Sequence, residues 1–157
     1  MDDIVIDFMK DDEVNKVAEL SYMVGKFHDD ALPEYFNTTS KDEHYKIIEN
    51  MKSNESAKIL VARNKENVVG FACLFIQENE HSGYKVKKVG YIYNFGVMNK
   101  FRRKGVGKKL VESSVEFFKQ NRCGAVDLNV FVFNAEALNF YKNSGFEMID
   151  VNMRRYL

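Results

Sequence analysis

The 157 residues carry a formal net charge of zero, with 23 Lys and Arg balanced by 23 Asp and Glu. Apolar residues make up 45% of the chain and aromatic residues 13%, a composition typical of a globular protein with a sizeable core and not of a disordered chain. The balanced charge argues against a nucleic-acid-binding surface spread over the whole protein.

No apolar run approaches the ~18 residues of a membrane span, and the first residues do not read as a secretory leader. Cys73 and Cys123 lie far apart in apolar surroundings, which favours buried thiols over a disulfide or a metal site. We therefore expect one cytoplasmic domain over residues 1–157, with no metal, no membrane contact and no nucleic-acid partner.

The N-terminal half predicts strands and helices by its periodicity. Alternating apolar residues predict a strand at 4–8, and Asp11 or Asp12 can cap a helix over 14–24. We expect residues 25–40, which start at Gly25 and contain the only proline, Pro33, to be irregular. A helix over 41–51 follows, and then strands at 59–62 and 68–77 joined by a hairpin turn.

The C-terminal half continues with a long strand that ends at Val97 and an apolar helical stripe that starts at Val106. Residues 126–132 predict the next strand, and Asn134 can cap a helix over 135–143. Residues 146–157 read as one strand or a short hairpin. The order of elements predicts an α/β fold of α+β type, with a central mixed β-sheet and helices on both faces.

The turn between the long strand and the following helix is strongly basic. It holds two glycines and six cationic residues, namely Gly105 and Gly107 with Lys100, Arg102, Arg103, Lys104, Lys108 and Lys109. The first N–H groups of a helix have no intrahelical partner, and glycines let a phosphate approach them. A Walker loop is excluded because its first glycine is missing, and the dinucleotide fingerprint is absent as well. The turn predicts a phosphate-binding site.

Two motifs in this order resemble the Gcn5-related N-acetyltransferase (GNAT) family. The first, Arg102-x-x-Gly105-x-Gly107 after Phe95-Gly96-Val97, resembles the family's acetyl-CoA pyrophosphate loop. The second is similar to the family's other signature and runs Leu128-x-Val130-x-x-x-Asn134-x-x-Ala137-x-x-x-Tyr141-x-x-x-Gly145-Phe146. With the matching β-α-β-α plan they cover roughly residues 57–150. The resemblance implies a single-domain acyl-CoA N-acyltransferase fold.

The resemblance also implies roles for individual residues. Pantetheine would lie between two splayed strands and contact the backbone of Phe95 and Val97, with the Val97 N–H polarising the thioester carbonyl. Asn134 would hold the pantetheine arm. Tyr141 would contact the cofactor and falls at the place of the general acid, and a phenol with a pKa near ~10 is protonated at pH 7. The pyrophosphate would lie on Arg102, Arg103, Lys104, Gly105, Val106, Gly107 and Lys108.

The resemblance implies direct attack of a neutral amine on acetyl-CoA, without an acyl-enzyme, and it leaves the general base open. Where several relatives carry a Glu, this chain has Tyr91 and Asn129. A water chain past Tyr91, Tyr93 and Asn94 is one hypothesis, and His28 or Glu34 is another. The spacing His28-x-x-x-x-Pro33-x-x-Phe36 resembles a recurrent feature near the acceptor pocket, which gives the candidate pocket residues His28, Glu34, Phe36, Tyr91 and Tyr93.

Three questions stay open at this point. Asp29, Asp30 and Glu34 would suit a cationic acceptor such as a polyamine, an aminoglycoside or a lysine side chain. A non-catalytic acyl-CoA-binding sensor on the same fold is the main alternative to an enzyme, and a nucleic-acid-binding module is a weaker one. Acyl groups longer than acetyl are not excluded, and a homodimer is common in the family without being indicated by any residue here.

Overall fold

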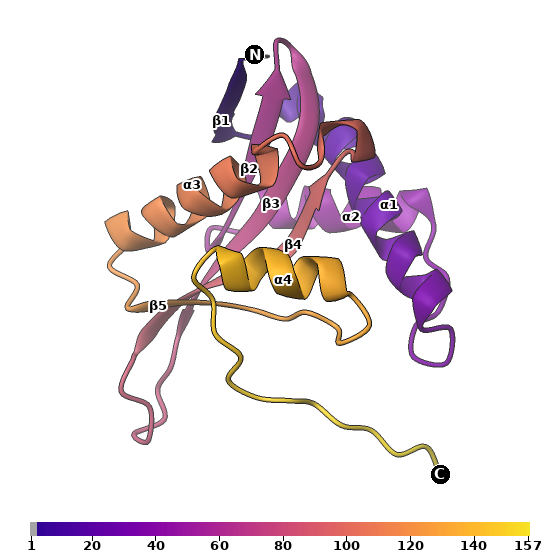
Figure 1. Ribbon diagram of the computed structural model, residues 1–157. Helices are drawn as coiled ribbons and strands as arrows, with labels where there is room; N and C mark the ends of the chain where they lie inside the picture. The colour runs from indigo at the N-terminus through magenta and orange to yellow at the C-terminus, as the bar shows by residue number, and fades with distance from the viewer. Residues whose placement is uncertain (1–2) are drawn as a thin grey trace.

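A five-stranded sheet forms the centre of the computed structural model, which describes residues 3–157 (Figure 1). The strands lie in chain order, and the first four pair antiparallel: β1 (Ile4–Phe8), β2 (Ala57–Asn64), β3 (Asn67–Glu78) and β4 (Lys88–Val97). The last strand, β5 (Ala125–Leu128), pairs parallel to β4. The mixed sheet predicted from the sequence is confirmed.

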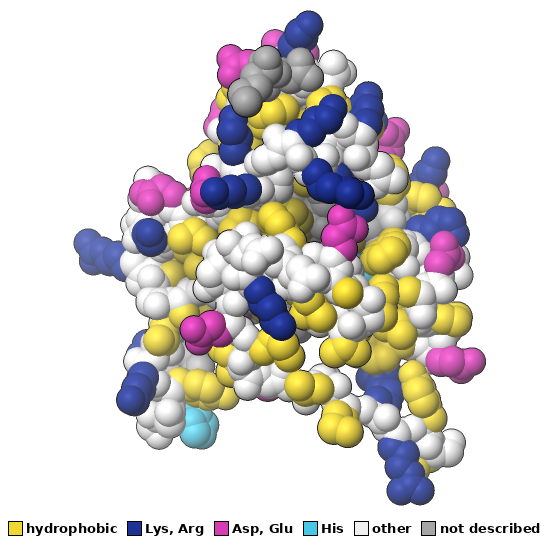
Figure 2. Space-filling view, viewed as in Figure 1, with side chains coloured by type: hydrophobic (Ala, Val, Ile, Leu, Met, Phe, Trp, Pro, Cys, Tyr) yellow, Lys and Arg dark blue, Asp and Glu magenta, His cyan; other side chains and the backbone are white. Residues whose placement is uncertain are grey.

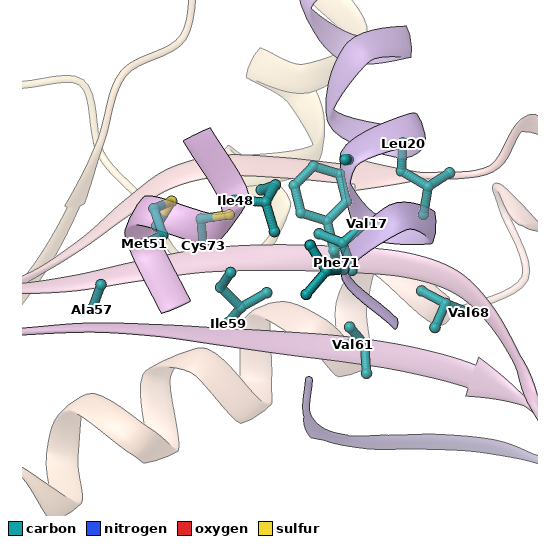
Figure 3. Packing of buried hydrophobic residues seen from close by; sticks show 12 residues of the cluster. Val17, Leu20, Ile48, Met51, Ala57, Ile59, Val61, Val68, Phe71 and Cys73 are labelled. Atoms are coloured by element: carbon teal, nitrogen blue, oxygen red, sulfur yellow. The ribbon is translucent and has the colours of Figure 1, made fainter. Parts of the chain in front are cut away.

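Helices cover both faces of this sheet. On one face, α1 (Val14–Ala31) follows a short 3-10 turn (Asp11–Glu13) and packs with α2 (Lys41–Lys52) over β2 and β3. Figure 3 shows Val17, Leu20 and Ile48 from these helices gathered around Phe71 of β3. On the other face, α3 (Val106–Gln120) follows a second 3-10 turn (Asn99–Phe101) and buries Leu110 and Phe118 against the sheet. Each such apolar side chain contributes about 1.5–3 kcal/mol when it is fully buried.

Two helix starts follow from their capping residues. The Ser40 hydroxyl accepts a hydrogen bond from the Glu43 N–H, and the Glu43 carboxylate accepts one from the Ser40 N–H, which fixes the start of α2. Asn134 caps α4 (Ala135–Asn143), because its Oδ1 accepts a hydrogen bond of 3.1 Å from the Ala137 N–H. Both starts agree with the sequence prediction to the residue.

The segment 25–40 is less irregular than predicted, because α1 continues through Gly25 to Ala31. The glycine does not break the helix. It makes room for His44 of α2, since a Cβ at this position would lie 2.7 Å from two atoms of the imidazole ring. The prediction was wrong here because a packing glycine and a helix-ending glycine look alike in the sequence.

The predictions for the last strands were also wrong in part. The strand expected at 126–132 ends at Leu128, and residues 146–157 form neither a strand nor a hairpin. This tail runs past α4 and away from the sheet (Figure 1), so no strand lies beside it to bond its backbone groups. Near its end it contacts the body at Tyr35 and Glu34, where the Arg154 guanidinium lies 4.1 Å from the Tyr35 ring centroid and the Tyr156 hydroxyl donates to the Glu34 carbonyl.

None of the helices in residues 3–157 combines the length and the apolar character that crossing a bilayer requires.

Candidate active site

The sheet opens where β4 and β5 part. The two strands pair only from Val89 to Ile92 on β4, and in the described part of the chain the rest of β4 has no partner on that side. A register shift in the β3–β4 pairing makes Tyr93 an extra residue at this point. Such a bulge bends a strand and increases its twist. The separation that the family resemblance implied is therefore present, and it begins at Tyr93.

A groove of about 1160 Å³ occupies this opening. It is lined by β4, the segment after β5, α1, α4 and the start of α3. Its volume slightly exceeds the range of ~300–1,000 Å³ that is typical of small-molecule sites, so two substrates can share it. Of the residues predicted to bind the cofactor, those in the wall are Phe95, Val97, Arg102, Arg103, Gly105, Gly107, Lys108, Asn134 and Tyr141.

Lys104 and Val106 are not part of this wall. The Val106 side chain is buried in the core, which leaves only its backbone N–H near the groove. The Lys104 ammonium lies 5.6 Å from the centre of the Phe101 ring, in a cation–π contact. Both residues were predicted to contact the pyrophosphate. Val106 can do so only through its backbone N–H, and Lys104 can contribute only its positive charge nearby.

The start of α3 exposes bare backbone. Gly105 precedes the helix with φ +80°, and Arg103 has φ +56°, so the loop enters the helix through two left-handed residues. A Cβ on Gly105 would meet nothing within 4 Å, which shows open space above this part of the backbone. The first turn of α3 contains no acidic residue. Its positive helix end is therefore not neutralised locally, which favours an anion.

The cations of the loop have few competing partners. The Arg102 Nε donates to the Val97 carbonyl at 3.1 Å and ties the loop to the end of β4. Lys108 and Glu112 approach to 3.8 Å, but both are exposed, so this pair is weak. Within residues 3–157, Arg103 makes no ion pair. Figure 2 shows Lys and Arg side chains in dark blue above α4.

Tyr141 of α4 lines the groove opposite β4. Its ring lies 6.0 Å from that of Phe95, 5.0 Å from that of Phe140 and 5.6 Å from that of Phe146. Burial raises the pKa of the Tyr141 hydroxyl above its usual value, so the phenol is protonated throughout the neutral range. A Cβ on Gly107 would lie 3.2 Å from the Phe140 ring, so the glycine allows α4 to approach the start of α3.

The α1 end of the groove is aromatic. The His28 ring lies 5.5 Å from that of Phe131 and 6.2 Å from that of Phe36. Burial lowers the pKa of His28, with partial opposition from Asp29, so the neutral imidazole is favoured. We call this group the aromatic cluster, and it consists of Phe27, His28, Tyr35, Phe36, Phe131 and Phe133. Phe131 and Phe133 were not singled out from the sequence, where Phe131 falls in the predicted strand 126–132 and Phe133 directly after it.

The predicted acceptor residues separate into two groups. His28 and Tyr93 line the groove, whereas Glu34, Phe36 and Tyr91 do not. Phe36 belongs to the aromatic cluster and packs against the His28 ring. Tyr91 is half-buried, and burial raises the pKa of its hydroxyl, with smaller contributions from Tyr93 and Asp127.

The acidic residues near α1 do not form a negative wall. Asp29 is buried and accepts hydrogen bonds from Thr39, at 3.1 Å from its backbone N–H and 3.4 Å from its hydroxyl. Asp30 bonds to Lys26 at 3.0 Å. Among the described residues that line the groove, Glu136 is the only carboxylate.

The thiols are poorly suited to nucleophilic catalysis. Cys73 is completely buried, and burial raises its pKa. Burial also raises the pKa of Cys123, although Lys88 opposes the effect. A thiol needs its thiolate form to attack a thioester, so this arrangement favours direct transfer over an acyl-enzyme.

Cations around an uncapped helix start, a pair of splayed strands and a protonated phenol on α4 are the arrangement that an acyl-CoA-dependent acyltransferase requires. The family model described as "Acetyltransferase (GNAT) family" matches residues 23–146. The chain therefore belongs to the GNAT acetyltransferase family, whose reaction is N-acetylation.

The relatives agree with this assignment. An N-alpha-acetyltransferase from Sulfurisphaera tokodaii is 31% identical over 130 residues, which cover 80% of this chain and 73% of the relative. The chain spans only 49% of N-alpha-acetyltransferase 30 from Saccharomyces cerevisiae, with 29% identity over 57% of its own length.

Solved structures share the fold at low identity. A tetramutant of the BH1408 protein from Bacillus halodurans matches with a TM-score of 0.90 and 20% identity, over 98% of this chain and 99% of that one. The aminoglycoside acetyltransferase AAC(6')-Iy, solved with a bisubstrate analogue built on CoA and acetylneamine, matches with a TM-score of 0.80 and 17% identity over 99% of both chains.

Proposed function

We propose that the protein transfers an acetyl group from acetyl-CoA to the α-amino group of a peptide or protein whose first side chain is hydrophobic. One observation carries this proposal. The groove has two chemically different ends, a basic glycine loop at the start of α3 and the aromatic cluster beside α1, and β4 runs between them.

The basic end suits the pyrophosphate of CoA. The first N–H groups of α3 point from an uncapped helix end, and Arg102, Arg103 and Lys108 surround them. Charge-assisted hydrogen bonds from these groups are stronger than neutral ones. Asn134 holds the pantetheine arm in this account, because its Oδ1 caps α4 and its amide N–H groups stay available.

The chemistry takes place near the end of β4. The amine nitrogen attacks the thioester carbon, the Val97 N–H stabilises the developing oxyanion, and the C–S bond then breaks. Tyr141 donates its proton to the departing thiolate, since it is protonated and lies across the groove from Phe95. The amine loses its proton to solvent through the mouth of the groove, and solvent returns a proton to the Tyr141 phenolate.

The aromatic end suits a hydrophobic side chain next to the amine. Polycationic acceptors need several carboxylates, and among the described residues the groove offers only Glu136, on the first turn of α4. Figure 2 shows hydrophobic side chains in yellow beside α4, on the side toward α1. The N-alpha-acetyltransferase of S. tokodaii, with 31% identity, supports a peptide α-amino group as the acceptor.

We propose the reducing cytosol as the site of action and one acetyltransferase domain as the functional unit. Both cysteines are free thiols, which supports a reducing compartment. Size-exclusion chromatography with light scattering tests whether the unit is a monomer or a homodimer.

The test is an acetylation assay with peptides that differ only in the first residue (Met, Leu, Phe, Ser or Asp), beside spermidine, lysine and the aminoglycoside sisomicin. Mass spectrometry identifies the acetylated product, and free CoA gives the rate. We expect kcat/KM for Met, Leu or Phe to exceed that for Asp by at least about tenfold, since each 1.4 kcal/mol of discrimination gives that factor.

An N-formyl peptide is the matched control and should not react. Faster acetylation of spermidine or sisomicin than of any peptide would contradict the proposed acceptor. Acetyl-CoA binding without CoA release for any amine would instead support the non-catalytic sensor.

A further inference from the structure

A continuous chain of hydrogen bonds leaves the groove wall and enters the space between α1 and α2. Asn94 Nδ2 lies 2.9 Å from Ser21 Oγ, and Ser21 Oγ lies 2.8 Å from His44 Nδ1. His44 Nε2 lies 3.0 Å from Thr39 Oγ1, which in turn lies 3.4 Å from an Asp29 oxygen. The four side chains behind Asn94 have no part in the acetyl transfer described above.

The fold makes specific room for this chain. Ser21 is 0% exposed, His44 6% and Asp29 9%, and each has a hydrogen-bond partner. A glycine inside a helix costs about 1 kcal/mol relative to alanine, yet α1 carries Gly25 at the point where the His44 ring lies against it. The imidazole is therefore seated between the helices by the backbone itself.

The carboxylate fixes the direction of every bond. Asp29 only accepts, so the Thr39 hydroxyl donates to it and accepts from the His44 Nε2–H. His44 Nδ1 then accepts from the Ser21 hydroxyl, whose oxygen accepts from Asn94. Burial lowers the pKa of His44, against the opposing effects of Asp29 and Glu43, which favours the neutral ring that this direction requires.

Asn94 stands at the end of this chain and lines the groove between Tyr93 and Phe95. Its partner across the β3–β4 ladder is Cys73, which packs in the core under α1 and α2, so Asn94 also faces α1. Within residues 3–157, Ser21 is the only hydrogen-bond partner of its carboxamide, through Nδ2. The Oδ1 is left to accept a hydrogen bond from a ligand.

We propose that Ser21, His44, Thr39 and Asp29 are positioning residues that hold the Asn94 carboxamide with its oxygen toward the acceptor amine. This inference rests on the proposed function, because it concerns the amine that the groove receives. A neutral amine must direct its lone pair at the thioester, and an acceptor for one of its N–H groups fixes that orientation. As the C–N bond forms, the nitrogen becomes positive, and the hydrogen bond to Oδ1 strengthens.

The direction of the chain can be tested without any acceptor. ¹⁵N NMR of the protein distinguishes the two neutral tautomers of His44, with assignment by a His44→Gln variant. We expect the hydrogen on Nε2 and a lone pair on Nδ1. A hydrogen on Nδ1 would reverse the chain and overturn the proposal, whatever the outcome of the acetylation assay.

The kinetic test uses Ser21→Ala and the best amine of the panel. Loss of one orienting hydrogen bond should lower kcat/KM for the amine about fivefold, with KM for acetyl-CoA unchanged. Ser114→Ala is the matched control, because Ser114 is also 0% exposed and donates only to Leu110 of its own helix. It should leave both parameters unchanged.

According to the proposal, Ser21→Ala lowers kcat/KM only because it releases the Asn94 carboxamide from its orientation. In an Asn94→Ala background, the further change caused by Ser21→Ala should therefore disappear. If Ser21→Ala lowers kcat/KM equally in both backgrounds, or raises KM for acetyl-CoA, the four residues only support the fold and the proposal is wrong. Thermal melting of each variant shows that the comparison is made between folded proteins.

Discussion

At the scale of single residues, the groove depends on glycines that serve different purposes. Gly105 has open space above it and is required by its backbone, because φ +80° is unfavourable for other residues. Gly107 and Gly25 instead have ordinary helical conformations, and each makes room for a neighbouring ring, that of Phe140 or His44. The sequence motif contains the first two, and only the structure explains the third.

Tyr141→Phe tests the phenol as a proton donor. The ring contacts with Phe95 and Phe140 should persist, so the variant should fold normally and bind acetyl-CoA with an unchanged Kd. We expect kcat to fall about 10²-fold, as is usual when a general acid is removed. Steady-state kinetics and a binding titration give the two values.

The control for this variant is Tyr84→Phe, because Tyr84 is exposed in the loop before β4, away from the groove. It should leave kcat unchanged. If kcat of Tyr141→Phe stays within about twofold of the wild type, the assigned role of Tyr141 is wrong.

At the scale of elements, periodicity predicted most helices and strands, but it could not predict where long-range contacts extend or end them. The capping residues Ser40 and Asn134 act locally, so the starts of α2 and α4 were predictable. The extension of α1 through Gly25 depends on a ring from α2. The end of β5 depends on its separation from β4, which no residue of 129–132 signals alone.

The difference between local signals and long-range contacts also explains why the basic end of the groove was predictable from the sequence and the aromatic end was not. The basic loop is one contiguous motif, and its residues Arg102, Arg103, Gly105, Gly107 and Lys108 all line the groove. The aromatic cluster joins α1, the loop after it and residues 131–133, and the polar chain joins five residues from 21 to 94. Pairings of this kind arise from tertiary packing. Tertiary packing also decides the position of the acidic residues that were expected to bind a cationic acceptor. Asp29 and Asp30 bond to other residues of the fold, and Glu34 lies outside the groove.

Gly90→Ala tests the packing of α3 on β4. A Cβ at Gly90 would overlap the ring of Phe118, which is completely buried. We expect the free energy of unfolding to fall by about 1–3 kcal/mol, as is common for overpacked cores. Urea denaturation of Gly83→Ala, in an exposed turn, serves as the control and should show a change within about 0.5 kcal/mol. Equal stability of Gly90→Ala and the wild type would contradict the described contact between β4 and α3.

At the scale of the whole molecule, the half-buried His28 and the buried His44 connect stability to pH. Burial lowers the pKa values of His28 and His44 in the folded state, so the unfolded chain binds protons more readily. Their contribution is present above the unfolded pKa of about 6.5 and is lost as the pH falls below it. Asp29 and Glu43 face His44, and Asp29 faces His28, and they oppose the shift only in part.

The free energy of unfolding should therefore decrease between about pH 6.5 and pH 5.5, and His44→Gln should make this decrease smaller. Urea denaturation at several pH values measures the slope. Ser114→Ala removes no titratable group and should leave the slope as in the wild type. A slope that is unaffected by His44→Gln would show that His44 does not titrate as its burial requires.

The most direct test of the account is the melting temperature with and without excess acetyl-CoA, for the wild type, Arg103→Ala, Gly105→Glu and the control Lys119→Ala at the far end of α3. A ligand at about 100 times its Kd stabilises the native state by ~2.7 kcal/mol, and each kcal/mol raises Tm by about 2–4 °C in a protein of this size. We predict this shift for the wild type and Lys119→Ala, a smaller one for Arg103→Ala and none for Gly105→Glu. A full shift in Gly105→Glu, or no shift in the folded wild type, would show that the start of α3 does not bind acetyl-CoA.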